Sequence, residues 1–515
     1  MSESEIAEPE LSTTATNEPQ TIGEMGKIAL EKNYKQASPE EKGDIELSIA
    51  NFIINHFHIK TTWDNKIHFY LDKKGIYTPR GENIIKAYIS NILNKTNTTH
   101  CDREIVHKII NATQVFKTVD ELAKKSGDEL YDVCLENGVL NVKTGEFKPH
   151  SHNEFFITKI HVTYNPEAKC PKIEKFLKEI AKKDYEDPEE KTYWQLVETA
   201  GWCLIQNEYY PQSAIALIGI GSNGKSTYIG LIRMFLGERN CTSISLLELE
   251  ENPFAKGFLF GRLANLYPEL TDKTIEHSGI FKQITGGDPV TADVKFGERF
   301  SFVNKAKLIF SANKYPRPPT DEDSNAFWRR WVKVSLEQSF TQAKGNENRD
   351  ILKEMCTPEE LSGFLNLALL GAKRLLNERQ FILDIGKSIE EKRRDYLLMS
   401  DVIPLFLDEA IVQSEGEYIT RKDMYLLFKA YVRITKSSIM YENFSQRKLT
   451  ASILGLISKQ RTRYGWIKKA VKTKENIDVW MNVKIADLKG LAEAYDDVSE
   501  EALHEEIERE EPIHF

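Results

Sequence analysis

The sequence lacks the features of a secreted or membrane-spanning protein. Its first 24 residues contain six glutamates and no lysine or arginine, so the basic start and the apolar run of a secretory signal are both missing. The most apolar stretch, 214–220, is far shorter than the roughly 20 residues that span a bilayer. We therefore predict a cytoplasmic protein that has no membrane partner.

Cysteine is scarce and scattered along the chain. The six cysteines lie more than thirty residues apart, and because no Cys-x-x-Cys pair exists, a zinc site of that type is unsupported. We expect reduced and mostly buried thiols, as is usual in the cytosol. No internal repeat is visible either.

The chain carries no overall excess of positive charge. Its 515 residues include 69 Lys+Arg and 78 Asp+Glu, a formal net charge of −9, which argues against a protein coated throughout by nucleic acid. The charge is nevertheless uneven: −6 in 1–24, +12 in 421–474 and −8 in 489–515. A basic module thus lies between two acidic ends, in a chain long enough for roughly three domains.

Composition and periodicity divide the chain into six segments. They are a disordered acidic N-terminus at 1–28, an α+β domain at 29–188, an α/β core at 189–345, a helical connector at 346–400, a basic module at 401–488 and an acidic tail at 489–515. In the first domain we expect a strand over 66–72, a turn at 73–75, a helix over 83–93 and a hairpin strand over 139–142. In the basic module we expect three helices followed by strands.

The strongest motif follows an apolar run suited to a buried strand, 214–218. It fits G-x-x-x-x-G-K-[ST] and comprises Gly219, Gly221, Ser222, Asn223, Gly224, Lys225, Ser226 and Thr227. Apolar residues then recur with helical spacing as far as Leu236, and Gly237 can end that helix. Such glycines let backbone N–H groups surround phosphate, while Lys225 would reach the β- and γ-phosphates and Ser226 would bind Mg²⁺. We therefore predict a site for ATP and Mg²⁺.

Two further strands end in polar residues that a phosphate-binding loop would need. Glu269 follows a strand expected over 263–267, where it would orient or deprotonate the attacking water and help to hold Mg²⁺. Taken alone, it could equally be a surface glutamate after a strand-ending proline. Asn313 ends a strand over 307–312, where its amide would contact the γ-phosphate and the water; alternatively, it forms a turn.

Arg329 and Arg330 are adjacent and stand between two tryptophans. They can be plain surface residues. In a ring-shaped ATPase, an arginine from a neighbouring subunit instead neutralises charge on the transferred phosphoryl group. Both interpretations stay open at this point.

The basic module has fourteen Lys/Arg between 421 and 474 against two acids. A helix capped by Ser445 would present Arg447 and Lys448, with apolar residues on its other side. The basic residues that follow occupy expected strand and turn positions: Arg461, Arg463, Lys468 and Lys469. A helix followed by a basic hairpin is the layout of a winged helix, which binds DNA. A solvated basic face without a ligand is the alternative.

Together these residues resemble a superfamily 3 helicase, and more narrowly the helicase half of the phage/plasmid primase family, which includes poxvirus-type primase-helicases. The resemblance runs from about residue 60 to 485. It is carried by 137–141 (NGVLN), 164–166 (YNP), 170–171 (CP), the loop at 219–227, 281–288 (FKQITGGD), Asn313 and 328–330 (WRR). The order of these motifs is more specific than any one of them.

The resemblance implies a P-loop AAA+-like α/β core with an α+β N-terminal domain and a C-terminal winged helix. It also implies a homohexameric ring, in the host cell of a virus or mobile element or in a prokaryote, that hydrolyses ATP, threads single-stranded DNA and unwinds forked DNA. Glu269 corresponds to the acidic motif, Asn313 to the polar sensor, and Arg329 or Arg330 to the finger. A separate primase or polymerase would be a further partner.

The resemblance also places 285–296 in the hairpin region of the central channel. Lys295 would then contact DNA phosphate, and Phe296 would pack beside the sugar or base. The alternative is a lysine on an ordinary hairpin next to a core phenylalanine.

Two departures from the family pattern matter. The acidic motif commonly has two adjacent acids, but Pro268 precedes Glu269, so either Glu269 works alone or Asp272 assists. About 50 residues precede the matched region, too few for a primase catalytic domain, and we expect no primer synthesis by this chain.

Three rival functions and the role of the tail stay open. The rivals are a DNA-binding ATPase that loads or remodels replication complexes without unwinding, a small-molecule kinase or NTPase, and a replication scaffold without enzymatic activity. The acidic tail would solubilise the protein, compete with DNA for the basic module, or recruit a basic partner.

Overall fold

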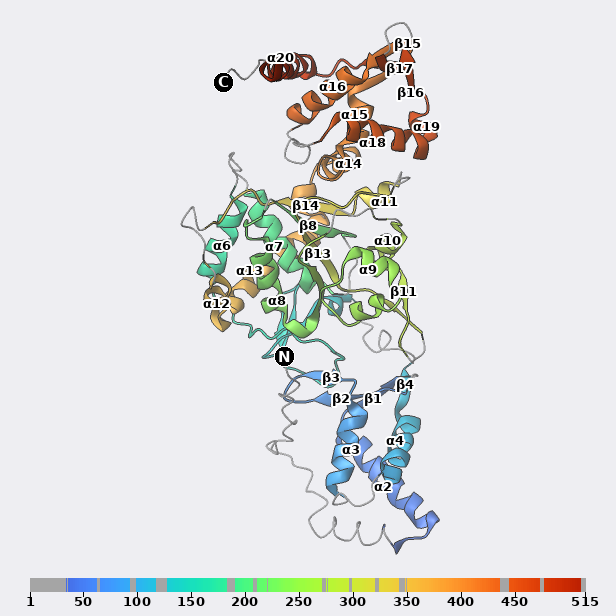
Figure 1. The fold of residues 1–515 in the computed structure, drawn as a ribbon. Coiled ribbons are helices and arrows are strands. Elements are labelled where there is room, and N and C mark those ends of the chain that lie inside the picture. The colour runs from blue at the N-terminus through green and yellow to red at the C-terminus, as the bar shows by residue number, and fades with distance from the viewer. Residues whose placement is uncertain are drawn as a thin grey trace, which may run out of the picture. The chain divides into compact units, whose positions relative to one another are not determined.

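The computed structural model describes most of the chain (Figure 1). The described residues are 34, 36–62, 65–92, 99–116, 127–182, 190–206, 211–219, 221–270, 275, 277–295, 299–319, 324–341, 348, 350–435, 444–472 and 477–510. The predicted disordered N-terminus lies outside them, as do Asp272 and Phe296. The chain forms two compact units, one of Met1–Glu129, Cys134–Leu140 and Phe147–Lys159, the other of Leu130–Val133, Asn141–Glu146 and Ile160–Phe515.

In the first unit, three helices pack against a four-stranded sheet of order β3-β2-β1-β4. The elements are α2 (Pro39–His56), β1 (Ile59–Thr62), β2 (Ile67–Leu71), β3 (Ile76–Thr78), α3 (Gly81–Ile92), α4 (Thr99–Thr113) and β4 (Gln114–Phe116). The predicted strand at 66–72 is β2, the predicted helix at 83–93 is α3, and Gly75 makes the turn with a φ of 67°. Ile85 and Ile89 of α3 are buried, so the 3.6-residue periodicity identified the correct face.

Three short strands follow, β5 (Asp132–Cys134), β6 (Val139–Asn141) and β7 (Phe147–Lys148). β6 pairs antiparallel with β7 and joins Val139 to Lys148 and Leu140 to Phe147. The predicted hairpin strand at 139–142 is therefore confirmed.

A five-stranded sheet forms the centre of the second unit, with the order β14-β8-β13-β10-β9 and every neighbouring pair parallel. Its strands are β8 (Ala214–Ile218), β9 (Cys241–Thr242), β10 (Ala264–Tyr267), β13 (Lys307–Ala312) and β14 (Trp331–Ser335). β8 and β13 are buried along their whole length, which explains why both read as continuous apolar runs. The predicted α/β class, with strands near 214–218, 263–267 and 307–312, is confirmed.

Helices surround this sheet (Figure 1). They include α6 (Pro171–Ala181), α7 (Lys191–Leu204), α8 (Lys225–Leu236), α9 (Leu246–Glu251), α10 (Gly279–Gly286), α11 (Asn325–Trp328), α12 (Ile351–Met355), α13 (Pro358–Glu378) and α14 (Ile389–Leu398). α7 and α13 approach closely because each has a glycine at the contact: Gly201 faces the backbone at Ala368, and Gly371 faces the backbone at Val197. A side chain at either glycine would meet main-chain atoms and push the helices apart.

The C-terminal module has a second, antiparallel sheet of order β15-β17-β16. Its elements are α15 (Val402–Ala410), β15 (Ile411–Thr420), α16 (Arg421–Ile434), α18 (Gln446–Lys459), α19 (Arg461–Tyr464), β16 (Lys468–Lys472) and β17 (Ile477–Ile485). We expected three helices before any strand, but β15 precedes α16. Only Ile411 and Ile419 of β15 are buried. Pairing with β17, and not an apolar alternation of its own, therefore forms this strand.

Arg461 and Arg463 lie in α19, although we expected them in strand or turn positions. Tyr464 ends this short helix and is buried, and its hydroxyl donates to Asp408 Oδ1 at 2.9 Å. The contact with Asp408, a residue far away in sequence, anchors the helical turn there, and no local pattern signals it.

The segment predicted as an acidic tail forms helix α20 (Leu491–Glu510), and its first turns pack against α16. Leu491, Ala494 and Val498 are buried at helical spacing. The Tyr495 hydroxyl donates to Asp423 Oδ1 at 3.1 Å. The acids occupy the remaining faces of the helix. The apolar stripe was therefore not apparent from the net charge of the segment. This part of the segment belongs to the module and is not simply a solubilising tail.

All six cysteines lie within the described residues; none forms a disulfide, and five are buried, as predicted. Within the described ranges we find no helix with the length and apolarity needed to traverse a lipid bilayer. The same residues contain no group of three or more His, Cys, Asp and Glu that could hold a metal ion.

Candidate functional site

The glycine-rich loop joins β8 to α8 and is sharply curled. Gly221, Ser222 and Gly224 have positive φ angles of 42°, 50° and 83°. Left-handed residues in such a turn point peptide N–H groups toward one side, and an anion-binding concavity is built in this way. α8 begins at Lys225, so the positive end of its dipole adjoins the loop.

Two side chains hold the loop together. Asn223 Nδ2 donates to the carbonyl of Leu336, just beyond β14, at 2.7 Å. Lys225 Nζ donates to Asn223 Oδ1 at 2.8 Å and to the carbonyl of Gly219. Burial lowers the pKa of Lys225, while the nearby carboxylate of Glu269 raises it. The Lys225 ammonium therefore points into the loop and has loop oxygens as its partners.

A cavity of about 610 Å³ lies beside the loop. Ser222, Gly224 and Thr227 form its loop side, and its apolar walls are Phe176, Phe340, Ile351, Leu352 and Met355. Ser226 is exposed next to Thr227 in the first turn of α8. Sequence reasoning missed the walls because they come from α6, α12 and the segment after β14, which are widely separated along the chain. The apolar face of α6, which contains Phe176, was the one available signal.

Strand order brings Glu269 and Asn313 to the same edge of the sheet as the loop. β13 lies between β8 and β10, and the carboxyl ends of parallel strands share one edge. Asn313 follows the last residue of β13, whose carbonyl accepts a hydrogen bond from Gly219 N at 3.2 Å. The residue after Glu269 donates its N–H to the carbonyl of Ser311 at 2.8 Å. Glu269 and Asn313 are both exposed at this edge.

Arg329 and Arg330 lie at the opposite edge, where β14 begins. The Arg330 carbonyl accepts a hydrogen bond from Ala214 N, at the start of β8, at 2.7 Å. The Arg330 side chain is buried and donates to Thr285 Oγ1 at 2.8 Å and to the carbonyl of Ala326 at 2.6 Å. Burial lowers the pKa of Arg330, although a guanidinium stays charged. Neither arginine has a hydrogen-bond partner within the described part of the loop.

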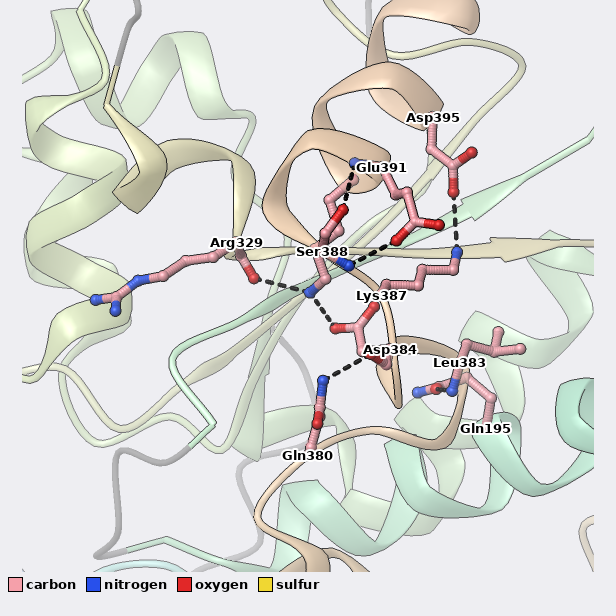
Figure 2. A network of polar contacts seen from close by, with 10 residues as sticks. Gln195, Arg329, Gln380, Leu383, Asp384, Lys387, Ser388, Glu391 and Asp395 are labelled. Carbon is pink, nitrogen blue, oxygen red and sulfur yellow. Dashed lines mark hydrogen bonds and ion pairs between the residues drawn. The ribbon is translucent and has the colours of Figure 1, made fainter.

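A buried ion pair holds the backbone of Arg329 (Figure 2). Lys392, on α14, donates to the Arg329 carbonyl at 3.0 Å and pairs with Asp384. The side chains of Lys392 and Asp384 are only 10% and 7% exposed. Figure 2 shows the Arg329 guanidinium pointing away from this network. There it is exposed and donates to Gln212 Oε1 at 2.9 Å. The main chain of Arg329 is therefore fixed while its charge faces outward.

The hairpin expected in 285–296 is present, with strands β11 (Pro289–Ala292) and β12 (Phe300–Val303). Lys295 is exposed in the connection between the strands. The ion pair between Arg299 and Asp293, at 2.7 Å, closes the base of that connection. Phe296, predicted next to Lys295, lies outside the described residues.

The cations of the C-terminal module fall into two groups. Arg447 and Lys448 are exposed in the first turn of α18, and the N–H of Lys448 donates to the capping Ser445 Oγ at 3.3 Å. This bond confirms the predicted start of the helix. Arg461 and Lys468 are also exposed.

The other group is engaged in ion pairs within the module. Arg463 Nε donates to Asp408 Oδ1 at 3.2 Å, and Nη2 of the same guanidinium binds the second carboxylate oxygen. Asp478 pairs with Arg421 at 3.2 Å and with Lys469 at 3.5 Å. The local charge of +12 therefore overstates how many cations face outward.

Three segments of the chain match known protein families. Residues 50–182 match the family described as D5 N terminal like, and residues 398–490 match the family described as Poxvirus D5 protein-like. Residues 217–330, which contain the loop and both arginines, match a family of unknown function, DUF5906. In the sequence, segments that match D5 families thus come before and after the strands of the parallel sheet.

One curated relative is the putative helicase L207/L206 of Acanthamoeba polyphaga mimivirus, 23% identical over 370 residues. The matched region covers 62% of this chain and 36% of the relative, so the chain spans about a third of the relative's length. Two solved structures of the NrS-1 C terminal region are 14% and 13% identical, with TM-scores of 0.47 and 0.42. They cover 85% and 84% of this chain, and 99% and 97% of their own chains.

Proposed function

We propose that this chain is an ATP-dependent replicative helicase of a virus or mobile element, which moves on single-stranded DNA and unwinds duplex DNA. The arrangement of Lys225, Glu269 and Asn313 around one edge of a parallel sheet carries the proposal. The D5-type segments and the helicase name of the viral relative support it.

The loop fits the phosphate groups of ATP. Its left-handed residues open a concavity, and an added Cβ at Gly221 would meet nothing within 4 Å. Phosphate oxygens would replace the loop oxygens that now satisfy the Lys225 ammonium. The cavity beside the loop, whose walls include the apolar Phe176 and Phe340 as well as charged residues such as Lys175, would take the base. Mg²⁺, when bound, would neutralise phosphate charge, and Ser226 and Glu269 are the residues that would hold it.

Glu269 and Asn313 would act on the attacking water. The Glu269 carboxylate would orient the water and take its proton, and the Asn313 amide would contact the water and the γ-phosphate. Both side chains emerge at strand ends that are bonded to their neighbours, so their positions relative to Lys225 are set by the sheet. Glu269 would work without an adjacent acid because Pro268 stands in that place.

A second subunit would complete the site. Arg329 is exposed at the sheet edge opposite the loop, so it would serve the loop of a neighbouring subunit. Arg330 is unsuited to this role because its guanidinium is bonded inside the core. A head-to-tail ring brings unlike edges of successive subunits together. We therefore propose Arg329 as the finger of a homohexamer in which ATP binds between subunits.

Two regions would contact DNA. Lys295, in the β11–β12 connection, would contact the backbone of a single strand in the ring, and Phe296 would pack beside it. The C-terminal module has the order helix, strand, helix, helix, short helix and hairpin, which supports a winged helix. Arg447 and Lys448 would contact duplex DNA through α18, and the exposed hairpin residue Lys468 would contact its backbone.

Unwinding of a forked DNA duplex tests the proposal. The wild-type protein should displace a strand when ATP and Mg²⁺ are present. Lys225→Ala should lower hydrolysis at least about 100-fold while single-stranded DNA binding persists. Lys295→Ala should abolish unwinding and spare basal hydrolysis, and Lys484→Ala, at an exposed lysine of β17, serves as its control.

Other outcomes would point to other functions. DNA-stimulated hydrolysis without strand displacement would indicate an ATPase that loads or remodels replication complexes. Hydrolysis that neither depends on DNA nor accompanies a ring would indicate a small-molecule kinase or NTPase. Full biological activity of Lys225→Ala would indicate a scaffold.

A further inference from the structure

A cleft of about 260 Å³ separates the end of α18 from the core, and its residues differ from those of the cavity beside the loop. Four cationic side chains line it: Arg317, Arg393, Lys459 and Arg463. Its remaining walls are largely apolar and include Trp328, Pro318 and Leu456. Nothing in the proposed hydrolysis or duplex contacts uses this cleft.

The nearby acids neutralise only part of this charge. Asp408 is bonded to Arg463 and to the hydroxyl of Tyr464, and Arg393 lies 3.7 Å from the same carboxylate. Asp401 also lines the cleft; it is half-buried at the start of α15 and accepts the N–H of Ile403 at 3.2 Å. Burial raises the pKa of Asp401, while the hydrogen bond from Ile403 and the charge of Arg317 act in the opposite direction.

Two cations remain for a ligand. Arg317 and Lys459 are exposed, and among the described residues their side chains make no hydrogen bond or close ion pair, although the charge of Arg317 does act on Asp401. Arg393 adds a third positive group in a fixed position, since its guanidinium lies 5.9 Å from the centre of the Trp328 ring. A concave site with several cations and few competing acids selects a polyanion.

We propose that this cleft binds the phosphates of a nucleic-acid strand. Cations would hold the phosphates, while the tryptophan, proline and leucine side chains would contact sugars and bases. A free polyphosphate has the same charged groups but has no apolar part that could contact the apolar walls. The inference rests on the proposed function in one respect only, namely that the phosphates belong to DNA. It adds a DNA contact that is separate from the exposed surface of α18.

Gly455 allows the sharpest test. It lines the cleft, and an added Cβ there meets nothing within 4 Å. Gly455→Glu and Gly455→Gln have nearly the same shape, both favour the helix, and they differ in charge. Full-length variants are titrated with a fluorescein-labelled single strand and with the matching duplex. Gly455→Glu should bind at least one of these about tenfold more weakly than Gly455→Gln.

A second pair of variants removes the cations. Arg317→Ala combined with Lys459→Ala should reduce the slope of log Kd against log salt by about 1 to 2. Lys484→Ala combined with Lys489→Ala removes the same charge from exposed positions on β17 and just beyond it, and should change the slope less. Melting temperatures show that all four variants fold.

Calorimetry with inorganic tripolyphosphate identifies the source of the phosphates. Loss of tripolyphosphate binding in Gly455→Glu, with DNA affinity equal to that of Gly455→Gln, would assign the cleft to a free polyphosphate and overturn its assignment to a nucleic-acid strand. Equal DNA affinity and equal tripolyphosphate binding in both members of each pair overturns the inference. A wild-type protein that binds no DNA would instead refute the proposed function.

Discussion

The parallel-sheet core and the C-terminal module position their charged residues in different ways. In the core, Glu269 and Asn313 leave strand ends whose main chains are bonded to neighbouring strands, so the sheet itself sets their places. In the module, cations project from helix and hairpin surfaces, and several reach acids, as Arg463 reaches Asp408. A sequence motif in the core therefore predicts where its side chains lie. In the module, a count of basic residues does not predict where their side chains lie.

The paired arginines show that this difference is not absolute. Arg329 and Arg330 are neighbours in one motif of the core, yet one guanidinium is exposed and the other is bonded to Thr285. Their roles follow from direction: Arg329 ends α11 and its guanidinium faces outward, whereas Arg330, just before β14, turns its guanidinium into the core. We therefore expect that charged side chains facing outward are needed for function, whereas those facing inward are needed for stability.

The largest effect is expected for Arg329→Ala, which should lower the kcat of DNA-stimulated hydrolysis about 1,000-fold. Its melting temperature should stay near that of the wild type because the guanidinium is exposed. When Arg329→Ala is mixed with Lys225→Ala, hydrolysis should exceed that of either variant, because a mixed interface joins an intact loop to an intact arginine. No recovery in freshly assembled mixtures would refute an arginine that acts between subunits.

Arg330→Met should act on stability and not primarily on catalysis. The change leaves Thr285 Oγ1 and the carbonyl of Ala326 without their donor, so the free energy of unfolding should fall by about 3 kcal/mol. Urea denaturation measures this, with Arg329→Ala as the matched control. A stable Arg330→Met protein that has lost hydrolysis would reverse the assignment of the two arginines.

In the module, Arg447→Ala combined with Lys448→Ala should weaken duplex binding about tenfold at constant salt. Arg463→Gln combined with Lys469→Gln removes the same charge from residues that are in ion pairs, and should cost stability with little loss of affinity. Fluorescence anisotropy and thermal denaturation of both doubles separate these effects. Equal losses of affinity would mean that the ion pairs do not decide which cations meet DNA.

The smallest expected effect concerns the acidic C-terminal helix. Tyr495→Phe removes the bond to Asp423 and should lower the free energy of unfolding by about 1 kcal/mol. Glu493→Gln, at an exposed position of the same helix, should leave the free energy of unfolding nearly unchanged. A neutral Tyr495→Phe would mean that the hydrogen bond to Asp423 contributes nothing measurable to stability.

Local signals made parts of the fold predictable. The β8–loop–α8 unit, the hairpin at β6 and β7, and the capped start of α18 were predicted because each follows from adjacent residues. β15 was missed because it forms by pairing with a strand some 60 residues later in the chain. α20 was misjudged because its buried stripe consists of small and scattered apolar residues among many acids. The walls of the cavity beside the loop were not predicted because their residues are also far apart in the sequence.

The sequence by itself determined the glycine-rich turn, the apolar strands β8 and β13 and the concentration of charge in 421–474. Only the tertiary structure decided that Glu269 and Asn313 share an edge with Lys225, that Arg330 is locked inside, and which cations remain exposed. The physical reason is how far apart in the sequence the interacting residues are. Turn conformation and burial pattern arise from neighbouring residues, whereas strand order and ion pairing depend on partners that folding brings from distant parts of the chain.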